Sequence, residues 1–361
     1  MSVASAPYQS PHAFVAGSDD PILVTGAAGY VGVRVVENLL RRGFRRIRCL
    51  VRSSVRAREL SRLAREYPTA ELRIEAGNLL SASDCARASD GVAVIYHLAA
   101  GIEKSFAGCF LNSVVTTRNL LDAATANPGL RRFVNVGSLA EYANYAIPRG
   151  GPLDERTAVD TRCADRHEAY AYAKVKQSQL VRDYAQTRGL PFVIVRPGVV
   201  FGPGKRKISD RVGISTFGPF LHLGLGNRLP LTYVDNCADA IVLAGLVVGI
   251  EGETFNIVDD DPPTSREFLR QYVRRVKRIR SIPVPYPIWY MFCYCWELYA
   301  EWSEGQLPPV FNRPTCSIYW KGNVYPNAKA RQSLGWPVGV PMQEGLDRFF
   351  AYLKDGESAR G

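Results

Sequence analysis

Residues 22 to 40 place three glycines between a strand-like run and a helical pattern, and this stretch restricts the fold more than any other. The run ILVT (22 to 25) is followed by Gly26, Gly29 and Gly32, and an apolar stripe at helical spacing comes next. Gly26 permits a sharp turn, and Gly32 lets the helix pack closely on the sheet. Gly29 lets a pyrophosphate approach the free N–H groups at the helix start. The stretch therefore predicts a strand, a turn and a helix that together hold an anion.

Short β-rich runs alternate with helical patterns along the first 200 residues. The runs are ILVT, RIRCLV (46 to 51), VAVIYHLAA (92 to 100), FVNVG (133 to 137) and FVIVRP (192 to 197). Continuous apolar runs of this length are typical of strands buried on both faces, and the helices between them imply parallel crossovers. We therefore expect an α/β fold with a doubly wound parallel sheet.

Composition argues against several classes of protein. The eight cysteines show neither CxxC pairs nor the spacing of a metal site or a disulfide framework, so we expect no metal and reduced thiols in a cytoplasmic protein. The formal charge of +11 comes from basic residues scattered over many segments, without an aromatic-interleaved module, so we expect no nucleic-acid partner. The opening residues, rich in Ser, Ala and Pro, lack the features of a secretion signal.

Several motifs along the chain resemble those of the extended short-chain dehydrogenase/reductase superfamily, which includes NAD-dependent epimerases/dehydratases and 3β-hydroxysteroid dehydrogenases. They are TGAAGYVG, HLAA (97 to 100), NSVVTTRNLLDAA (112 to 124), RPGVVFGPG (196 to 204), TYVDNCADAIVLA (232 to 244) and KARQSLGWPVGVPMQEGL (329 to 346). The resemblance implies a Rossmann-type sheet with a smaller C-terminal substrate-binding lobe. It also implies a homodimer that pairs through helices near 104 to 125 and 168 to 188.

The domain boundaries follow from the motifs and from a change in pattern after Pro197. We expect a loose tail over 1 to 20 and a mainly dinucleotide-binding domain over 21 to 200. Residues 201 to 361 are expected to form mainly the substrate lobe, interleaved with late Rossmann elements near 229 to 260.

The resemblance also implies that a nicotinamide dinucleotide is the cofactor. The residues expected to bind it are Gly26, Ala28, Gly29, Tyr30, Val31, Gly32, Arg52, Asn78, Leu79, Leu98, Ala99, Ala100, Asn112, Tyr170, Lys174, Pro197 and Val199. An acid at the end of the second strand takes the ribose hydroxyls of NAD, whereas an Arg accommodates the 2′-phosphate of NADP. Val51 and Arg52 stand there, so NADP is favoured over NAD. Asn78 replaces the usual Asp after the third strand and can still bond an adenine edge.

The segment YAYAKVK offers two Tyr-Lys pairs four residues apart on a predicted helix. They are Tyr170 with Lys174 and Tyr172 with Lys176, and both have the required reach. A free Tyr has a pKa too high for a base at neutral pH, so a neighbouring ammonium group is needed to stabilise the phenolate. The family tends to place a small residue just before its Lys, as Ala173 is, so we favour Tyr170 and Lys174.

Ser138, which follows the strand FVNVG, matches the family serine that holds the reacting oxygen. The mechanism that the resemblance implies has Tyr170 take a proton from a substrate alcohol while C4 of the nicotinamide takes the hydride. Lys174 would bind the nicotinamide ribose and lower the pKa of Tyr170. Reduction of a ketone runs the same steps backward.

The substrate is expected to be an apolar, 3β-hydroxysteroid-like alcohol or ketone. Relatives that act on nucleotide sugars usually carry Asn and Arg at two positions, where this chain has Val199 and Leu229. RPGVVFGPG and TYVDN look instead like the 3β-hydroxysteroid dehydrogenase branch.

Two alternatives stay open. Lys205, Arg206, Lys207 and Arg211 begin the substrate lobe and could clamp a diphosphate, which favours a nucleotide-sugar epimerase or dehydratase. The second is a non-catalytic NAD(P)-binding protein, against which the presence of Ser138 and of the Tyr-Lys pair argues.

A basic segment precedes an aromatic run in the last third of the chain. Seven basic residues lie between Arg266 and Arg280, and the aromatic run follows from Tyr286 to Trp302. The run is too short and too interrupted by acids to span a bilayer, but it could lie on an anionic membrane surface. Peripheral membrane contact through 266 to 302 is therefore one hypothesis, and a buried or partner-facing helix is the other.

Overall fold

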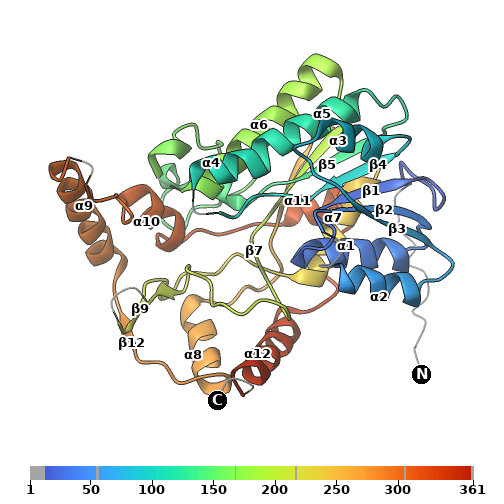
Figure 1. Ribbon diagram of the computed structural model, residues 1–361. Coiled ribbons are helices and arrows are strands. Elements are labelled where there is room, and N and C mark those ends of the chain that lie inside the picture. Colours follow the sequence, from blue (N-terminus) through green and yellow to red (C-terminus); the bar gives the residue numbers. More distant parts are fainter. Residues whose placement is uncertain are drawn as a thin grey trace.

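A computed structural model describes residues 13–53, 57–103, 105–166, 168–215, 218–304 and 306–358. Its centre is a seven-stranded sheet in the order β11-β6-β5-β4-β1-β2-β3, and all paired neighbours run parallel (Figure 1). The strands are β1 (Ile22–Thr25), β2 (Arg46–Val51), β3 (Glu71–Ala76), β4 (Val94–His97), β5 (Arg132–Val136), β6 (Phe192–Pro197) and β11 (Thr254–Ile257). Strand order reverses between β1 and β4, so the sheet is doubly wound. The predicted α/β Rossmann-type fold is confirmed.

Helices cover both faces of this sheet, and each face has its own apolar core (Figure 1). One layer contains α1 (Tyr30–Arg41), α2 (Arg58–Glu66), α7 (Val234–Leu246) and α11 (Ala328–Leu334). The other contains α3 (Ala82–Ser89), α5 (Thr116–Thr125) and α6 (Ala169–Arg188). All residues of β1, β4 and β6 are buried because both faces are covered.

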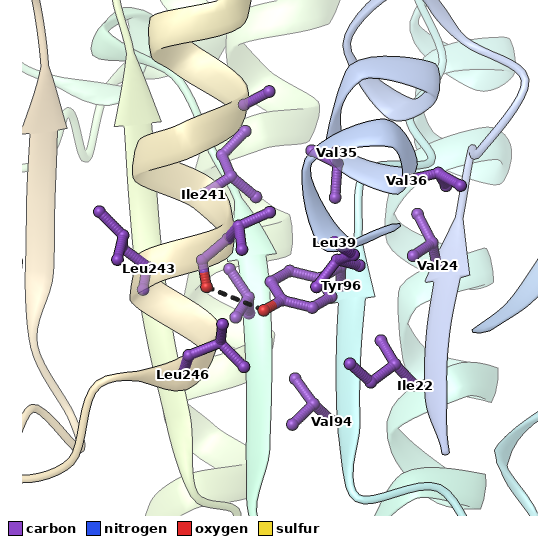
Figure 2. Close-up of a cluster of buried hydrophobic side chains, with 14 of the residues drawn as sticks. Ile22, Val24, Val35, Val36, Leu39, Val94, Tyr96, Ile241, Leu243 and Leu246 are labelled. Atoms are coloured by element: carbon purple, nitrogen blue, oxygen red, sulfur yellow. Dashed lines mark hydrogen bonds between the residues drawn. The ribbon is translucent and has the colours of Figure 1, made fainter. Parts of the chain in front are cut away.

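The core between α1, α7 and the sheet shows why these residues form these elements (Figure 2). Val35, Val36 and Leu39 recur at helical spacing on α1 and are fully buried against the sheet. Burying one such side chain stabilises the fold by about 1.5–3 kcal/mol. Tyr96 of β4 enters the same core, and its hydroxyl donates to the carbonyl oxygen of Val242 over 2.9 Å. The buried hydroxyl is thereby satisfied.

The second lobe consists of short strands and helices gathered to one side of the large sheet (Figure 1). Its strands are β7 (Val199–Phe201), β8 (Gly213–Ile214), β9 (Phe220–His222), β10 (Leu231–Tyr233) and β12 (Ser281–Pro283). Its helices are α8 (Ser265–Arg275), α9 (Tyr286–Trp302), α10 (Arg313–Trp320) and α12 (Met342–Ser358). One apolar cluster joins α8 and α12 to β7 and β10, and a separate cluster joins α9 to α10. The chain returns to the large sheet through α7 and β11 before it builds the rest of the lobe.

Two segments differ from expectation. Residues 13 to 20, expected to be part of a loose tail, lie against the end of α7: the Val15 amide donates to the carbonyl oxygen of Leu246 over 2.7 Å, and Ala16 is buried. The rest of the expected tail, residues 1 to 12, lies outside the described residues.

The long helix before β5 is divided into α4 (Phe106–Cys109), the π-helical segment η2 (Phe110–Val115) and α5. Such π-helical turns are common next to functional sites.

The cysteines lie in several different elements. All eight are free, seven are buried, and Cys295 on α9 is exposed. Within the described ranges, no three His, Cys, Asp or Glu side chains gather as a metal site requires. Most of the thiols therefore pack as small apolar groups.

Candidate active site

The turn after β1 is packed so closely that glycine is required. Gly26 has a φ of +68°, and a Cβ on it would lie 2.9 Å from the backbone nitrogen of Ala99. A Cβ on Gly32 would lie 2.2 Å from the carbonyl oxygen of Gly26. Because these residues have no side chain, the loop after β1 can pack closely against both the start of α1 and the loop after β4.

Helix α1 begins beside this turn without a side-chain cap. Its N-cap is Gly29, and its first turn carries no acidic residue. The free amides and the helix dipole therefore favour an anion at this end. The pyrophosphate of a dinucleotide fits here because no side chain of Gly29 covers the amides.

The other predicted cofactor residues follow neighbouring strands at the same edge of the sheet. They are Ala28, Tyr30 and Val31 after β1, Arg52 after β2, Asn78 and Leu79 after β3, and Leu98, Ala99 and Ala100 after β4. Arg52 is exposed. The Asn78 Oδ1 accepts the amide of Leu80 over 3.0 Å and so closes its own turn. The carboxyl ends of these strands therefore offer one continuous edge to a ligand.

Two predicted cofactor residues have protein neighbours of their own. Asn112, on η2, donates from Nδ2 to the carboxylate of Glu103 over 2.7 Å. The Tyr30 ring lies under Lys205, whose Nζ is 5.1 Å from the ring centroid. Its hydroxyl is buried and has no hydrogen-bond partner among the described residues. Tyr30 therefore connects the glycine turn with the start of the second lobe.

Ser138 and Tyr170 lie together in a cavity of about 330 Å³, and predicted cofactor residues Pro197 and Val199 line it as well. Ser138 follows β5 and caps the short helix η3 (Leu139–Glu141), while Tyr170 lies in the first turn of α6. Burial raises the pKa of Tyr170 to about 12, although the hydrogen bond between the Tyr170 and Ser138 side chains opposes this rise. The phenol is therefore protonated at neutral pH.

Lys174 lies one helical turn after Tyr170 and is buried. Its Nζ donates to the carbonyl oxygen of Val136 over 2.6 Å and to Gln177 Oε1 over 2.9 Å. Burial lowers the pKa of Lys174 to about 8. An ammonium group has three N–H donors, so one remains for a ligand.

A buried polar chain extends from Lys174 to the end of β1, and the sequence did not predict it. The side-chain Nε2 of Gln177 donates to Thr117 Oγ1 over 2.8 Å. The His97 ring lies between two threonines: its Nε2 bonds Thr117 Oγ1 and its Nδ1 bonds Thr25 Oγ1, each over 2.8 Å. Since Thr117 donates its own proton to a backbone carbonyl, His97 must donate from Nε2. Burial, together with the charge of Lys174, lowers the pKa of His97 to about 3. This hydrogen-bonded network is therefore uncharged apart from Lys174 itself, and it holds the lysine in position.

The second Tyr-Lys pair of α6 faces elsewhere. The Tyr172 ring packs edge-on against Phe106 of α4, with centroids 5.7 Å apart. The Lys176 Nζ lies 5.8 Å from the Tyr172 ring centroid. Tyr170 lines the cavity with Ser138, whereas Tyr172 does not.

A buried ion pair supports the Ser138 turn from below. The Arg196 guanidinium contacts the carboxylate of Glu141 at 2.8 and 2.9 Å, and both side chains are almost fully buried. Glu141 also accepts the amide of Ser138 over 2.8 Å. The Tyr142 ring covers the guanidinium at 4.4 Å. Ser138 is thus held by β5, η3 and β6 together.

The opposite wall of the cavity comes from the second lobe and is both apolar and basic. Its residues are Val200, Phe201, Lys205, Lys207, Ile208, Ser209, Asp210, Arg211, Pro230, Leu231, Phe268, Ile318, Tyr319 and Phe349. Arg211 is already engaged, since its guanidinium donates to the Ile318 carbonyl oxygen over 2.9 Å. Arg206, expected beside these residues, does not line the cavity.

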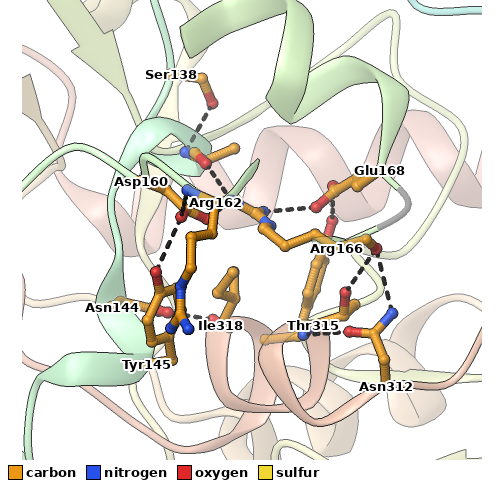
Figure 3. Close-up of polar contacts among 12 residues, drawn as sticks. Ser138, Asn144, Tyr145, Asp160, Arg162, Arg166, Glu168, Asn312, Thr315 and Ile318 are labelled. Atoms are coloured by element: carbon orange, nitrogen blue, oxygen red, sulfur yellow. Dashed lines mark hydrogen bonds and ion pairs between the residues drawn. The ribbon is translucent and has the colours of Figure 1, made fainter. Parts of the chain in front are cut away.

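A second buried ion-pair cluster ties this wall to the dinucleotide-binding half (Figure 3). Arg166, in η5 (Cys163–Arg166), lies between Asp160 at 3.4 Å and Glu168 at 2.6 Å, and donates to the Ala140 carbonyl oxygen over 2.7 Å. Its own carbonyl oxygen accepts a hydrogen bond from the side-chain Nδ2 of Asn312 over 3.1 Å. One arginine therefore joins the loop after β5 to α10.

The chain is similar over most of its length to proteins of known description. It is 27% identical over 351 residues to a 3 beta-hydroxysteroid dehydrogenase/Delta 5-->4-isomerase of Mycobacterium tuberculosis, covering 92% of this chain and 90% of that one. It is also 27% identical over 350 residues to a 2-alkyl-3-oxoalkanoate reductase of Stenotrophomonas maltophilia, covering 91% and 98%. A UDP-glucuronic acid 4-epimerase from Bacillus cereus, solved with UDP-glucuronic acid and NAD, superposes with a TM-score of 0.69. The two sequences are 20% identical, and the match covers 93% of this chain and 99% of the epimerase chain. At this low identity, the similarity supports the fold alone.

A family assignment completes the description. Residues 22–257 match the NAD dependent epimerase/dehydratase family. The match begins with β1 and ends with β11, so it includes the glycine turn, Ser138 and the Tyr-Lys pairs of α6. The chain therefore belongs to the NAD dependent epimerase/dehydratase family.

Proposed function

We propose that the protein is an NAD(P)-dependent oxidoreductase that transfers a hydride at a secondary alcohol or ketone of an apolar, 3β-hydroxysteroid-like substrate. The observation that carries this proposal is that Tyr170 and Ser138 line one cavity, with Lys174 buried one helical turn away. The apolar side chains of the opposite wall favour an apolar substrate. The likeness to a 3 beta-hydroxysteroid dehydrogenase and to a 2-alkyl-3-oxoalkanoate reductase supports the same class.

The residues present fit a nicotinamide dinucleotide. The amides after Gly29 would hold the pyrophosphate, and Lys174 has one N–H left for the nicotinamide ribose. When bound, the dinucleotide donates or accepts the hydride. We further propose a preference for NADP, because Arg52 is exposed at the end of β2, where it could pair with a 2′-phosphate.

The side chains of the cavity supply the proton. In ketone reduction, the Tyr170 hydroxyl donates its proton to the carbonyl oxygen as negative charge develops there, and the Ser138 hydroxyl holds the same oxygen. The charged Lys174 then stabilises the phenolate that remains. Oxidation of an alcohol needs the phenolate first, which is the less populated form of a phenol with a pKa of about 12. At neutral pH the resting site therefore holds the proton that ketone reduction needs.

One experiment tests the proposed class of reaction. Any nucleotide that copurifies with the protein is identified by mass spectrometry, and absorbance at the reduced-nicotinamide band is then followed with steroid ketones, steroid alcohols and UDP-sugars. We expect net oxidation of the cofactor by an apolar ketone. Inversion of a UDP-sugar without net cofactor turnover would overturn the proposal.

A nucleotide-sugar epimerase is the second candidate, and a specific observation favours it. Lys205 and Lys207 line the active-site cavity, where they could contact a diphosphate. A Lys205→Gln, Lys207→Gln double variant separates the candidates: an epimerase would lose affinity for UDP-sugars by a large factor, whereas a dehydrogenase of apolar substrates would keep its KM.

We also propose that α9 lies on an anionic membrane surface. Ile288, Met291, Leu298 and Trp302 form one stripe along the helix and are between 48% and 77% exposed. The segment before this helix carries four exposed basic residues, Arg274, Lys277, Arg278 and Arg280, which complement an anionic surface. None of the described helices has the length and apolar character needed to cross a bilayer. Pelleting with phosphatidylserine liposomes at low salt, and its loss in Met291→Ser, Leu298→Ser, checks the proposal; equal pelleting of the variant would overturn it.

A homodimer is proposed through α4, η2, α5 and α6, which lie side by side (Figure 1). Phe106, Phe110 and Leu111 are between 38% and 48% exposed on this surface. Exposed apolar side chains grouped on one surface are typical of interfaces. Light scattering after gel filtration should give twice the chain mass, and Leu111→Glu should give the monomer.

A further inference from the structure

A second cavity of about 250 Å³ lies directly beside the active-site cavity. Glu168, Asp210 and Tyr319 line both cavities. The Tyr319 hydroxyl donates to Glu168 over 2.9 Å, so these two side chains form part of the partition. Glu168 is also the residue before α6, two positions ahead of Tyr170. The partition therefore stands next to the proposed proton donor.

The active-site cavity alone offers little room. Ligand pockets usually measure about 300–1,000 Å³, and this cavity of about 330 Å³ is at the lower limit. Part of it is also bounded by Pro197 and Val199, two residues predicted to contact the cofactor. A substrate too long for this cavity would extend past the partition into the second one.

The lining of the second cavity indicates what it can accept. Ile214, Phe311 and Trp320 supply apolar surface, and the exposed Val310 lies at its solvent side. Its polar residues are Arg166, Glu168, Asp210, Asn312, Thr315 and Tyr319. Arg166 is 2% exposed, and its Nε has no hydrogen-bond partner among the described residues. A buried donor without a partner is costly, so an acceptor that reaches it gains free energy.

The charge around Arg166 selects the kind of acceptor. Asp160 and Glu168 already contact its guanidinium, so the three groups together carry one negative charge when ionised. A further carboxylate would be repelled, whereas a neutral carbonyl or hydroxyl oxygen would not.

We propose that the second cavity binds the distal end of the substrate, and that this end carries a neutral hydrogen-bond acceptor, namely a ketone or hydroxyl oxygen. The reacting oxygen would lie at Tyr170 and Ser138, the apolar body would cross the partition, and the distal oxygen would accept from Arg166. Tyr319 and Glu168 would separate when such a substrate enters. This inference rests on the proposed apolar substrate and makes it more specific: a rigid molecule with an oxygen at each end.

Equilibrium dialysis of the full-length protein with a matched pair of probes tests this inference. The probes are androst-5-en-3β-ol and its 17-keto derivative, which differ only in the distal oxygen. The protein should bind the 17-keto probe about tenfold more tightly, the effect of one hydrogen bond to a charged donor. Ile214→Trp, which fills the second cavity, should weaken binding of the 17-keto probe at least tenfold. The matched control Val324→Trp, at a half-exposed position outside both cavities, should not.

Two further measurements keep the test independent of folding and of the proposed reaction. Turnover of cyclohexanol, which fits the active-site cavity alone, should be the same in Ile214→Trp and in the unsubstituted protein. Equal binding of both probes, or no effect of Ile214→Trp on the 17-keto probe, would overturn the second-cavity inference even if steroids are turned over. Tight binding that depends on the 17-keto group, without any turnover, would instead leave the second cavity standing and refute the proposed reaction.

Discussion

The packed sheet of the dinucleotide-binding half and its junction with the substrate lobe are stabilised in different ways. In the first, fully buried strands such as β1 and β4 pack against helices through apolar side chains, and glycine lets backbone approach backbone closely. At the junction with the lobe, buried ion pairs hold the segments of this half that face the lobe: Arg166 with Asp160, and Arg196 with Glu141. A closely packed site is destabilised when an atom is added, whereas a buried ion pair is destabilised when one of its charges is removed. The two regions should therefore respond to opposite kinds of substitution.

The largest effect is expected on α6, where the two regions share the active site. Tyr170→Phe should lower kcat/KM about 10³-fold, since a positioned acid contributes about 10²–10⁴, and should leave nucleotide affinity within about twofold. Tyr172→Phe, at the same spacing from its own lysine, should change neither quantity. Steady-state kinetics and nucleotide titration measure both. If turnover persists in the first variant and is lost in the second, the assignment of the proton donor is wrong.

The next largest effect should come from the charged junction. Arg166→Met leaves Asp160 buried without its cation and should cost about 4 kcal/mol of unfolding free energy, as expected when one partner of a buried pair is removed. Adding Asp160→Asn should restore most of this loss, because the uncompensated charge disappears with it. Urea unfolding of both variants measures the difference. A double variant as unstable as Arg166→Met would show that shape, not charge, dominates this contact.

The same contrast explains how much of the fold could be predicted. The strands of the large sheet were predictable because a strand buried on both faces requires a continuous apolar run, as in ILVT and FVIVRP. Strands β8, β9 and β12 have two or three residues, too few for any period to show. Ion pairs such as Arg166 with Asp160 leave no signal either, since both residues lie in irregular segments.

The candidate site was predictable in part for the same reason. Ser138, Tyr170 and Lys174 follow from a motif with fixed spacing, and the cavity holds the first two. The chain through Gln177, Thr117 and His97 was missed because each of these polar residues lies within an otherwise ordinary helix or strand. The motifs HLAA and NSVVTTRNLLDAA contain two of them, and polar residues inside buried elements were the available signal.

Close packing in the dinucleotide-binding half is tested by adding one methyl group. Gly32→Ala should cost about 2–3 kcal/mol, because overpacking forces the backbone apart, and the new Cβ would lie 2.2 Å from the Gly26 carbonyl oxygen. Nucleotide binding should weaken in parallel. Gly226→Ala in the lobe has no atom within 4 Å of the new Cβ and should be neutral or slightly stabilising. Equal losses in both variants would remove the distinction between the two regions.

A smaller effect is expected in the pH dependence of catalysis. The pKa of Lys174 is lowered to about 8 by burial, so the residue loses its charge above this pH. For ketone reduction, kcat/KM should therefore fall about tenfold per pH unit above pH 8, following the ionisation of the free enzyme. Lys174→Gln should have a low and flat profile. Lys205→Gln, on the lobe side of the cavity, should keep the profile of the unsubstituted protein; a profile without the alkaline fall would contradict the role of Lys174.

One buried carboxylate is expected to oppose folding. Asp259 is 2% exposed and accepts the Tyr233 amide and the Asn236 side chain with one oxygen, while its other oxygen has no partner among the described residues. Burial raises the pKa of Asp259 from 3.8 to about 7. The folded state therefore holds a proton that the unfolded state releases between these two values, and stability falls as pH rises through that window.

Asp259→Asn removes this titration and should flatten the pH dependence of stability between pH 4 and 7. The linkage term between pH 4 and pH 8 is about 4 kcal/mol, and the two hydrogen bonds to the carboxylate are already included in the raised pKa. Urea unfolding should therefore show a gain of up to about 4 kcal/mol at pH 8 and almost none at pH 4. Asp347→Asn is the opposite control, since Arg275 lowers the pKa of Asp347 and its removal should slightly destabilise the protein at pH 8. A loss of stability in Asp259→Asn at pH 8 would mean that this carboxylate, like Asp160, strengthens the junction that it occupies.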